Sequence, residues 1–246
     1  MFNRICRIAA VACICIGFAG PARAAGDTIR VATDATFPPF EYYAGGKRTG
    51  FDIALVDAIG KTMGKKIEWT DIDFKGLIPG IISKRFDMAA SAIYITPERA
   101  KVVDFSEPYY PGGLVILVKK DNTTIHGPED LAGKKVSVQV GTKSVGFLKD
   151  NYPKVDRVEV EKNEEMFSLV ETGRVDAAVT GKPAAKLYAQ KNPGVKVIDK
   201  QLTTEEYGFA ISKDEPGLAK AVNEALAKLK ADGTYRKLVD TWFEGR

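Results

Sequence analysis

The chain has 246 residues, of which 45% are hydrophobic and 28% charged, and its formal charge is +4. A chain of this length can bury one large core or two smaller ones. The lysines are scattered among acidic residues instead of forming one stripe, which excludes the charge pattern of a nucleic-acid-binding protein.

The first 24 residues have the order of parts that is typical of a secretory signal peptide. Arg4 and Arg7 form a short positive region, residues 8–18 are almost wholly apolar, and residues 22–24 (Ala-Arg-Ala) match a cleavage site. The apolar run is too short to cross a membrane, which takes roughly 20 residues. We expect cleavage after Ala24 and a periplasmic location. All three cysteines and three arginines leave with this segment, so the formal charge falls from +4 to +1.

The remaining chain alternates short β-rich runs with helical segments, which favours an α/β architecture. Gly64 is placed to end the first helix. Strands are expected at residues 29–33, 67–69, 87–93, 114–118 and 136–140, and helices at residues 51–63, 76–84, 218–230 and 234–242.

Two segments about 90 residues apart repeat one pattern: residues 85–91 and residues 174–180. Each has a basic residue, then an aspartate two positions later, then a small apolar strand that ends in a hydroxyl. Chance similarity between two ordinary helix–strand units is one interpretation. The other is a pair of similarly built lobes, each with a hydroxyl at the carboxyl end of a strand, where ligands collect in open α/β sheets.

No set of residues has the spacing of a catalytic or metal-binding constellation. The only histidine, His126, lies in a polar turn, so we expect no catalytic residue, no metal and no cofactor. Residues 141–144 (Gly-Thr-Lys-Ser) lack the earlier glycine of a phosphate-binding loop. They indicate a strand-to-helix turn instead, whose free N–H groups suit a carboxylate.

Three segments are candidates for a small-ligand cleft: residues 34–40, residues 91–99 and the turn at residues 140–144. The first offers an acid and aromatic faces, and in the second Arg99 could pair with a carboxylate through two hydrogen bonds. Each also has an ordinary interpretation: a capping aspartate, core aromatics, and a surface arginine on a helix that starts at Thr96.

The motifs taken together resemble the polar amino-acid-binding proteins of ABC importers (solute-binding protein family 3), in particular those that bind lysine/arginine/ornithine, histidine and glutamine. The resemblance covers essentially the whole chain after residue 24, and its motifs are at residues 34–40, 50–52, 74–79, 95–99, 104–106, 141–144, 232–235 and 242–243.

This resemblance implies a periplasmic-binding-protein fold, with two α/β lobes joined by a two-strand hinge. Residues 25–112 and 208–246 would form the first lobe, and residues 113–207 the second. It also implies a role for individual residues. Arg99 would clamp a ligand carboxylate, Asp34 would read the ligand's side chain, and Phe37 and Phe74 would enclose its aliphatic part. The full implied set is Asp34, Phe37, Phe74, Ser91, Ala92, Tyr94, Arg99, Gln139, Thr142, Lys143, Thr180 and Gly181.

Two of these positions depart from the pattern of the family. Gly181 stands where relatives usually place an aspartate for the ligand's ammonium group, and Tyr94 stands where a serine or threonine is usual. A buried ammonium without an acid costs several kcal/mol. Either Glu205 or Glu206 replaces that acid, or the ligand lacks an ammonium and suits Lys143 and Lys182. If the rest of the site is like that of the family, a Gly181→Asp substitution would raise the affinity for α-amino acids.

The resemblance implies a monomeric transport receptor that closes on an amino acid or related carboxylate and delivers it to an inner-membrane ABC permease. One alternative is a binder of a small organic anion. Another is a periplasmic enzyme on the same scaffold, similar to a cyclohexadienyl dehydratase. A third, a sensor domain that feeds a membrane kinase, is disfavoured because the last family motif falls at the end of the sequence.

Overall fold

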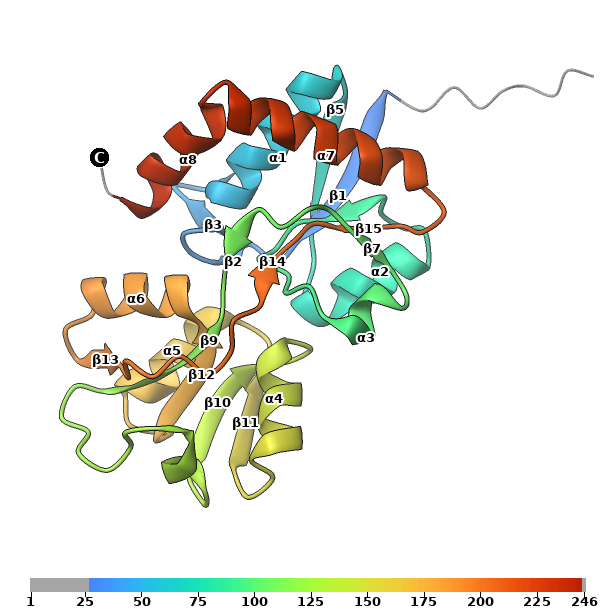
Figure 1. Cartoon of the computed structure of the whole chain (residues 1–246). Helices are drawn as coiled ribbons and strands as arrows, with labels where there is room; N and C mark the ends of the chain where they lie inside the picture. Colours follow the sequence, from blue (N-terminus) through green and yellow to red (C-terminus); the bar gives the residue numbers. More distant parts are fainter. Residues whose placement is uncertain (1–26, 245–246) are drawn as a thin grey trace, which may run out of the picture.

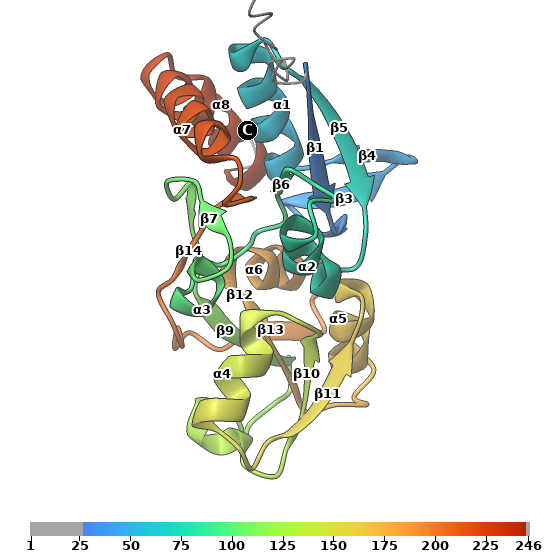
Figure 2. The same ribbon diagram turned by 90° about the vertical axis from the view of Figure 1, so that its right-hand side faces the viewer.

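A computed structural model describes residues 27–244 of the chain, which form two α/β lobes (Figure 1). The proposed signal peptide and its cleavage site lie outside these residues. The view in Figure 2 is turned by 90° and shows one lobe above the other, with β1 and β5 in the upper lobe and β10 and β11 in the lower. These strands are β1 (Thr28–Thr33), β5 (Lys66–Asp71), β10 (Lys135–Gln139) and β11 (Asp156–Val160).

The first lobe is built around a five-stranded sheet whose order is β5-β1-β6-β15-β7. Its other strands are β6 (Met88–Ala89), β7 (Asp104–Phe105) and β15 (Ala210–Ile211). A small hairpin sheet follows β1, with strands β2 (Thr36–Phe37), β3 (Glu41–Ala44) and β4 (Lys47–Thr49). The helices are α1 (Phe51–Met63), η1 (Phe74–Gly76), α2 (Leu77–Ile82), α3 (Pro97–Ala100), α7 (Pro216–Ala231) and α8 (Thr234–Phe243).

The second lobe has its own five-stranded sheet, in the order β11-β10-β12-β9-β13. The remaining strands of this sheet are β9 (Leu114–Lys119), β12 (Ala177–Gly181) and β13 (Val195–Val197). Its helices are η2 (Pro128–Leu131), α4 (Lys143–Asn151), α5 (Asn163–Glu171) and α6 (Lys182–Lys191).

Two chain segments connect the lobes where β8 (Tyr110–Pro111) pairs with β14 (Glu206–Tyr207) in an antiparallel two-stranded sheet. The chain leaves the first lobe through β8 and returns through β14, as Figure 1 shows. This is the expected periplasmic-binding-protein fold with its two-strand hinge. The lobe boundaries at residues 112/113 and 207/208 remain our proposal.

The two large sheets have the same arrangement of strands. In each, a central strand (β6 or β12) pairs in parallel with one neighbour and antiparallel with the other. The aspartates of the repeated pattern, Asp87 and Asp176, each accept a hydrogen bond from the backbone of a neighbouring strand. Asp87 accepts a hydrogen bond from the backbone N–H of Arg30 on β1, and Asp176 accepts one from that of Lys135 on β10, both at 2.8 Å. The repeat in the sequence therefore corresponds to equivalent positions in two similarly built lobes.

The end of helix α1 shows how the sequence sets an element. Gly64 adopts the left-handed conformation (φ 67°), and its N–H bonds back to the carbonyls of Gly60 and Lys61, as expected for a helix that stops at glycine. The helix buries Phe51, Leu55 and Ile59, which recur at helical spacing, and it packs against α7 and α8.

Two elements differ from the sequence-based expectation. The strand expected at residues 87–93 is only Met88–Ala89. The N–H of Ala90 still donates to the carbonyl of Ala32 on β1, but the contacts of the two residues after it involve side chains. Ser91 Oγ accepts from the N–H of Asp34, and the N–H of Ala92 donates to Asp52 Oδ2. The helix expected at residues 76–84 ends earlier, at Ile82. Between residues 27 and 244, no helix is long and apolar enough to cross a membrane.

Candidate ligand-binding site

A cavity of about 30 Å³ lies between the two lobes and is lined by residues of both. Every residue of the predicted set except Arg99 lines it. This volume holds about two water molecules, so an amino acid needs the lobes to separate or side chains to move. The lining also includes residues that were not predicted: Glu41, Leu114, Ser144, Asn163, Met166, Val179 and Tyr207.

Arg99 lies beside the cavity, at the contact between the lobes. Thr96 caps the short helix α3 by accepting from the N–H of Arg99. The guanidinium donates to the carbonyl of Tyr94 at 2.9 Å and, across the lobes, to that of Gly141 at 3.1 Å. It also lies 5.6 Å from the centre of the Phe74 ring. Burial lowers the pKa of Arg99 to about 10. Within residues 27–244 no carboxylate lies within ion-pair distance of it, so this cation is suited to receive an anion.

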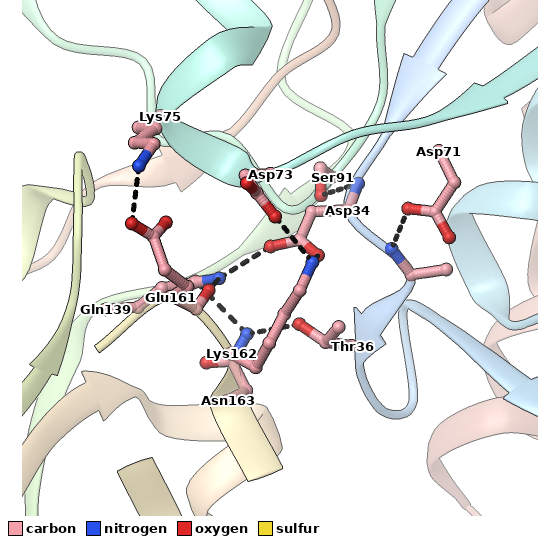
Figure 3. A network of polar contacts seen from close by, with 11 residues as sticks. Asp34, Thr36, Asp71, Asp73, Lys75, Ser91, Gln139, Glu161, Lys162 and Asn163 are labelled. Carbon is pink, nitrogen blue, oxygen red and sulfur yellow. Dashed lines mark hydrogen bonds and ion pairs between the residues drawn. The ribbon is translucent and has the colours of Figure 1, made fainter. Parts of the chain in front are cut away.

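Asp34 is the centre of a polar network between the lobes (Figure 3). It is 1% exposed, and both of its carboxylate oxygens have partners from the second lobe. Gln139 Nε2 donates to Oδ2 at 2.6 Å, and Lys162 Nζ lies 3.2 Å from Oδ1. Burial raises the pKa of Asp34, while Lys162 and Gln139 act in the opposite direction. Asp34, the residue predicted to contact the ligand's side chain, therefore already has partners within the protein.

Other contacts in Figure 3 hold the lobes together around Asp34. Lys75 of the first lobe pairs with Glu161 of the second. Asn163 donates to Thr36 Oγ1 at 3.0 Å and to Gln139 Oε1 at 3.1 Å. The bond between Asn163 and Gln139 lies within the second lobe. The contacts of Lys75 with Glu161 and of Asn163 with Thr36 form only when the lobes are close together, so the structure represents a closed arrangement.

A pair of buried carboxyl groups, Glu41 and Asp52, lies under the cavity. Burial and the neighbouring charge of Asp52 raise the pKa of Glu41 well above its usual value. Burial also raises the pKa of Asp52, to about 6, although the N–H of Ala92, the hydroxyl of Tyr109 and Glu41 act against it. Among the described residues, neither Glu41 Oε2 nor Asp52 Oδ1 has a hydrogen-bond partner. Two buried neighbouring carboxyl groups disfavour a second negative charge, so we expect the pair to retain one proton on Glu41, whose pKa is raised well above its usual value.

The two unusual positions of the family pattern meet at the wall of the cavity. Tyr94 and Tyr207 pack with their ring centres 4.5 Å apart. A Cβ atom added at Gly181 would lie 2.4 Å from the hydroxyl of Tyr207 and 3.1 Å from the ring of Phe37. Aromatic side chains therefore occupy the space in which the resemblance implied an acid.

Glu205 and Glu206 were the two candidates to replace the missing acid at position 181. One forms an ion pair with a lysine, and the other is exposed. Glu205 Oε1 lies 2.8 Å from Nζ of Lys143, a residue that lines the cavity. Glu206 is exposed on β14. Lys182 donates to Gln201 at 2.7 Å and does not line the cavity. Ala92 belongs to the implied ligand-binding set, but its N–H donates to Asp52 Oδ2 at 2.9 Å. The N-terminus of α4 at Thr142 remains directed at the cavity, as expected from the strand-to-helix turn.

The residues that sequence reasoning missed have one feature in common. Glu41, Lys162 and Tyr207 act through contacts between segments far apart in the chain, and none belongs to a motif that we had singled out. Asn163, directly after Lys162, is the first residue of α5. The available signal for Lys162 was its place between a strand that ends at Val160 and a helix that begins at Asn163.

Comparison with known proteins now decides the family. Residues 29–245 match the family model of the bacterial extracellular solute-binding proteins, family 3. The chain belongs to this family. Among its relatives is the ABC transporter arginine-binding protein 1 of Escherichia coli (strain K12), which is 34% identical over 225 residues, with 89% of this chain and 92% of that protein covered.

Two further similarities show the range of this family. The L-cystine-binding protein TcyJ of Escherichia coli (strain K12) is 34% identical over 219 residues, covering 88% of this family-3 protein and 82% of the relative. A solved structure, of the ancestral amino acid-binding protein AncCDT-1, a precursor of cyclohexadienyl dehydratase, is 45% identical with a TM-score of 0.83. The match covers 88% of this chain and 96% of that one. The names of these relatives thus include a ligand with a basic side chain, arginine, and one without a basic side chain, L-cystine.

Proposed function

We propose that this chain is the solute-binding receptor of an ABC importer. It captures a small polar amino acid or a closely related carboxylate between its lobes and delivers it to a permease in the inner membrane. Membership of the family and the names of the relatives support this role. The receptor acts as a monomer in the periplasm after cleavage of residues 1–24, which mass spectrometry of the exported protein would test.

The observation that carries the proposal is the guanidinium of Arg99 at the contact between the lobes. It is half-buried, it touches both lobes, and it has two hydrogen bonds to carbonyls although it has five donors. A carboxylate bound here would neutralise the cation and gain a hydrogen-bonded partner from each lobe. The ligand would then stabilise the closed arrangement more than the open one, which is the condition for ligand-driven closure.

A thermal-shift screen followed by calorimetry tests this proposal. The panel contains amino acids, their keto and hydroxy analogues, and small organic anions. A ligand at 100 times its dissociation constant adds about 2.7 kcal/mol to the free energy of unfolding, which is easily measured. Arg99→Ala is expected to abolish binding of the best ligand. Arg236→Ala, which removes an exposed arginine of α8, serves as the matched control. Unchanged affinity in Arg99→Ala would disprove the assignment.

The enzyme alternative has one specific observation in its favour, since Glu41 is a protonated carboxyl that lines the cavity. A dehydratase needs such a proton donor. However, Glu41 already bonds to Ser91 Oγ at 3.1 Å and retains its proton beside Asp52, so that proton is directed away from a ligand. We therefore propose a receptor and not an enzyme. Formation of an aromatic product from a cyclohexadienyl acid, followed by ultraviolet absorbance, would contradict this.

A further inference from the structure

The contacts of Asp34 lead to an inference about the ligand that rests on the proposed receptor function. We propose that Lys162 is an internal counter-ion for Asp34, and that the site therefore selects a carboxylate ligand whose side chain carries no positive charge. In this protein a lysine of the second lobe takes the place that the basic tail of a ligand would occupy.

The position of Lys162 is fixed by two acids. Its Nζ lies 3.2 Å from Asp34 Oδ1 and 2.8 Å from Asp73 Oδ1 (Figure 3). Burial lowers the pKa of Lys162, but the hydrogen bonds and charges of Asp73 and Asp34 outweigh it and raise that pKa overall. The lysine is therefore charged at neutral pH.

The second oxygen of Asp34 is also occupied, by an amide that is itself held in place. Gln139 Nε2 donates to Asp34 Oδ2 and to the carbonyl of Glu161 at 2.9 Å. Its Oε1 accepts from Asn163, which also reaches Thr36 of the first lobe. Each partner of Asp34 in the second lobe is thus supported by further hydrogen bonds, and the aspartate is satisfied without a ligand.

The charges of the network disfavour a basic ligand tail. A guanidinium or ammonium that reached Asp34 would come close to the charged Nζ of Lys162, and like charges at such short range repel. An acidic tail would meet Asp34 and Asp73. Besides its polar and charged residues, the lining includes aromatic and aliphatic side chains that can enclose an uncharged part of a ligand: Phe37, Phe74, Tyr94, Leu114, Met166, Val179 and Tyr207.

The test measures binding of L-arginine and of the best uncharged ligand from the panel to four proteins by calorimetry. The wild type is compared with Lys162→Met, Lys162→Arg and the double variant Lys162→Met/Asp34→Asn. Lys162→Met is expected to bind arginine at least tenfold more tightly than the wild type does, because Asp34 is freed. Lys162→Arg keeps the wild-type preference, and the double variant loses the gain.

Lys75→Met is the matched control, since it removes the other ion pair between the lobes without touching Asp34. Lys75→Met is expected to leave the affinity for arginine unchanged. This result would show that the gain in Lys162→Met comes from the lost charge beside Asp34 and not from a weaker contact between the lobes. Arginine binding to the wild type that is as tight as to Lys162→Met overturns the proposal. So does a Lys162→Met variant that melts normally and gains no affinity for arginine.

Failure of this inference can be told from failure of the receptor function. A wild type that binds arginine tightly in an Arg99-dependent way remains a receptor, although Lys162 is then not a selective element. A wild type that binds nothing in the solute panel contradicts the receptor role, whatever Lys162→Met does with arginine.

Discussion

The hydroxyl oxygens of Tyr94 and Tyr207 lie 3.1 Å apart, next to the space in which a side chain at position 181 would begin. Gly181 has φ −65° and ψ 132°, a conformation open to any residue, so lack of room and not backbone strain requires the glycine. Tyr94 and Gly181, the two positions that depart from the pattern of the resemblance, lie next to each other. The hydroxyl of Tyr207 and the ring of Phe37 fill the space where a side chain at position 181 would begin.

This relationship revises what to expect of Gly181 variants. Gly181→Asp is now expected to give no gain in amino-acid affinity, because the first side-chain atom meets Tyr207. Gly181→Ala should lower the free energy of unfolding by about 1–3 kcal/mol, as overpacking does. In a Tyr207→Phe background the cost should be smaller, since the hydroxyl at 2.4 Å is gone.

Urea denaturation of the four proteins of this double-mutant cycle measures the coupling. The control is Gly146→Ala on α4, where an added Cβ has open space and a gain of about 0.5–1 kcal/mol is expected. An equal cost of Gly181→Ala in both backgrounds would show that the hydroxyl is not what excludes a side chain.

Closure should depend on Gly141. A Cβ there would lie 2.9 Å from the Cα of Lys75 in the opposite lobe, and Gly141 has φ 78°. We expect Gly141→Ala to raise the dissociation constant of the best ligand at least tenfold and to increase the radius of gyration of the liganded protein in X-ray scattering.

Gly133→Ala is a matched control for the backbone strain, since Gly133 has φ 74° and open space around its Cβ position. Both substitutions should cost about 1–2 kcal/mol of folding free energy. Only Gly141→Ala should affect binding. A similar loss of affinity in both variants would assign the effect to strain in the second lobe and not to the contact between lobes.

The carboxyl pair of Glu41 and Asp52 predicts how stability depends on pH. Both pKa values are raised by burial, so the folded protein retains a proton that the unfolded chain releases. The stabilisation is complete below the unfolded pKa values and is lost as the pH rises through the folded ones. The free energy of unfolding should therefore fall between about pH 5 and 7, by up to about 1.4 kcal/mol per pH unit for each proton.

Glu41→Gln should flatten this slope, because the amide donates a hydrogen bond without a titrating proton. Urea denaturation at several pH values gives the slope directly. Glu224→Gln, at an exposed carboxylate of α7, is expected to behave like the wild type. A wild-type stability that rises over this range would contradict the retained proton.

The equivalent aspartates of the two lobes should have equivalent effects. Asp87→Ala and Asp176→Ala each remove an acceptor for a backbone N–H, and each is expected to cost about 1 kcal/mol. Asp87 also pairs with Arg30 at 2.6 Å, so its loss should be somewhat larger. Hydrogen exchange should locate each effect in the substituted lobe, and a change confined to the other lobe would disprove the equivalence.

Local signals in the sequence were sufficient for most elements of the fold. Gly64 ends α1 and Thr96 caps α3, because both act within a few residues of themselves. The repeat at residues 85–91 and 174–180 indicated two similar lobes, and the sheets have that arrangement. The motif set also placed its candidate residues around one cavity.

The contacts that the sequence could not predict join segments that are far apart in the chain. Lys162 meets Asp34 across 128 positions, and Tyr207 meets Tyr94 across 113, so neither pair has a local pattern. The same holds for Glu41, whose pKa depends on the buried carboxyl of Asp52 in the following helix. Alignment with a family assigns roles by position, and it does not show when a neighbour already fills that role.

The path of the chain also orders the folding of the two lobes in time. Strand β15 lies between β6 and β7, so the first sheet stays interrupted until residues 210–211 have been synthesised. The second sheet comes entirely from residues 114–197. During synthesis at roughly 5–20 residues per second, the amino-terminal lobe is therefore the one that finishes last. The cavity between the lobes, which Tyr207 helps to line, can therefore form only after the chain has returned to the first lobe.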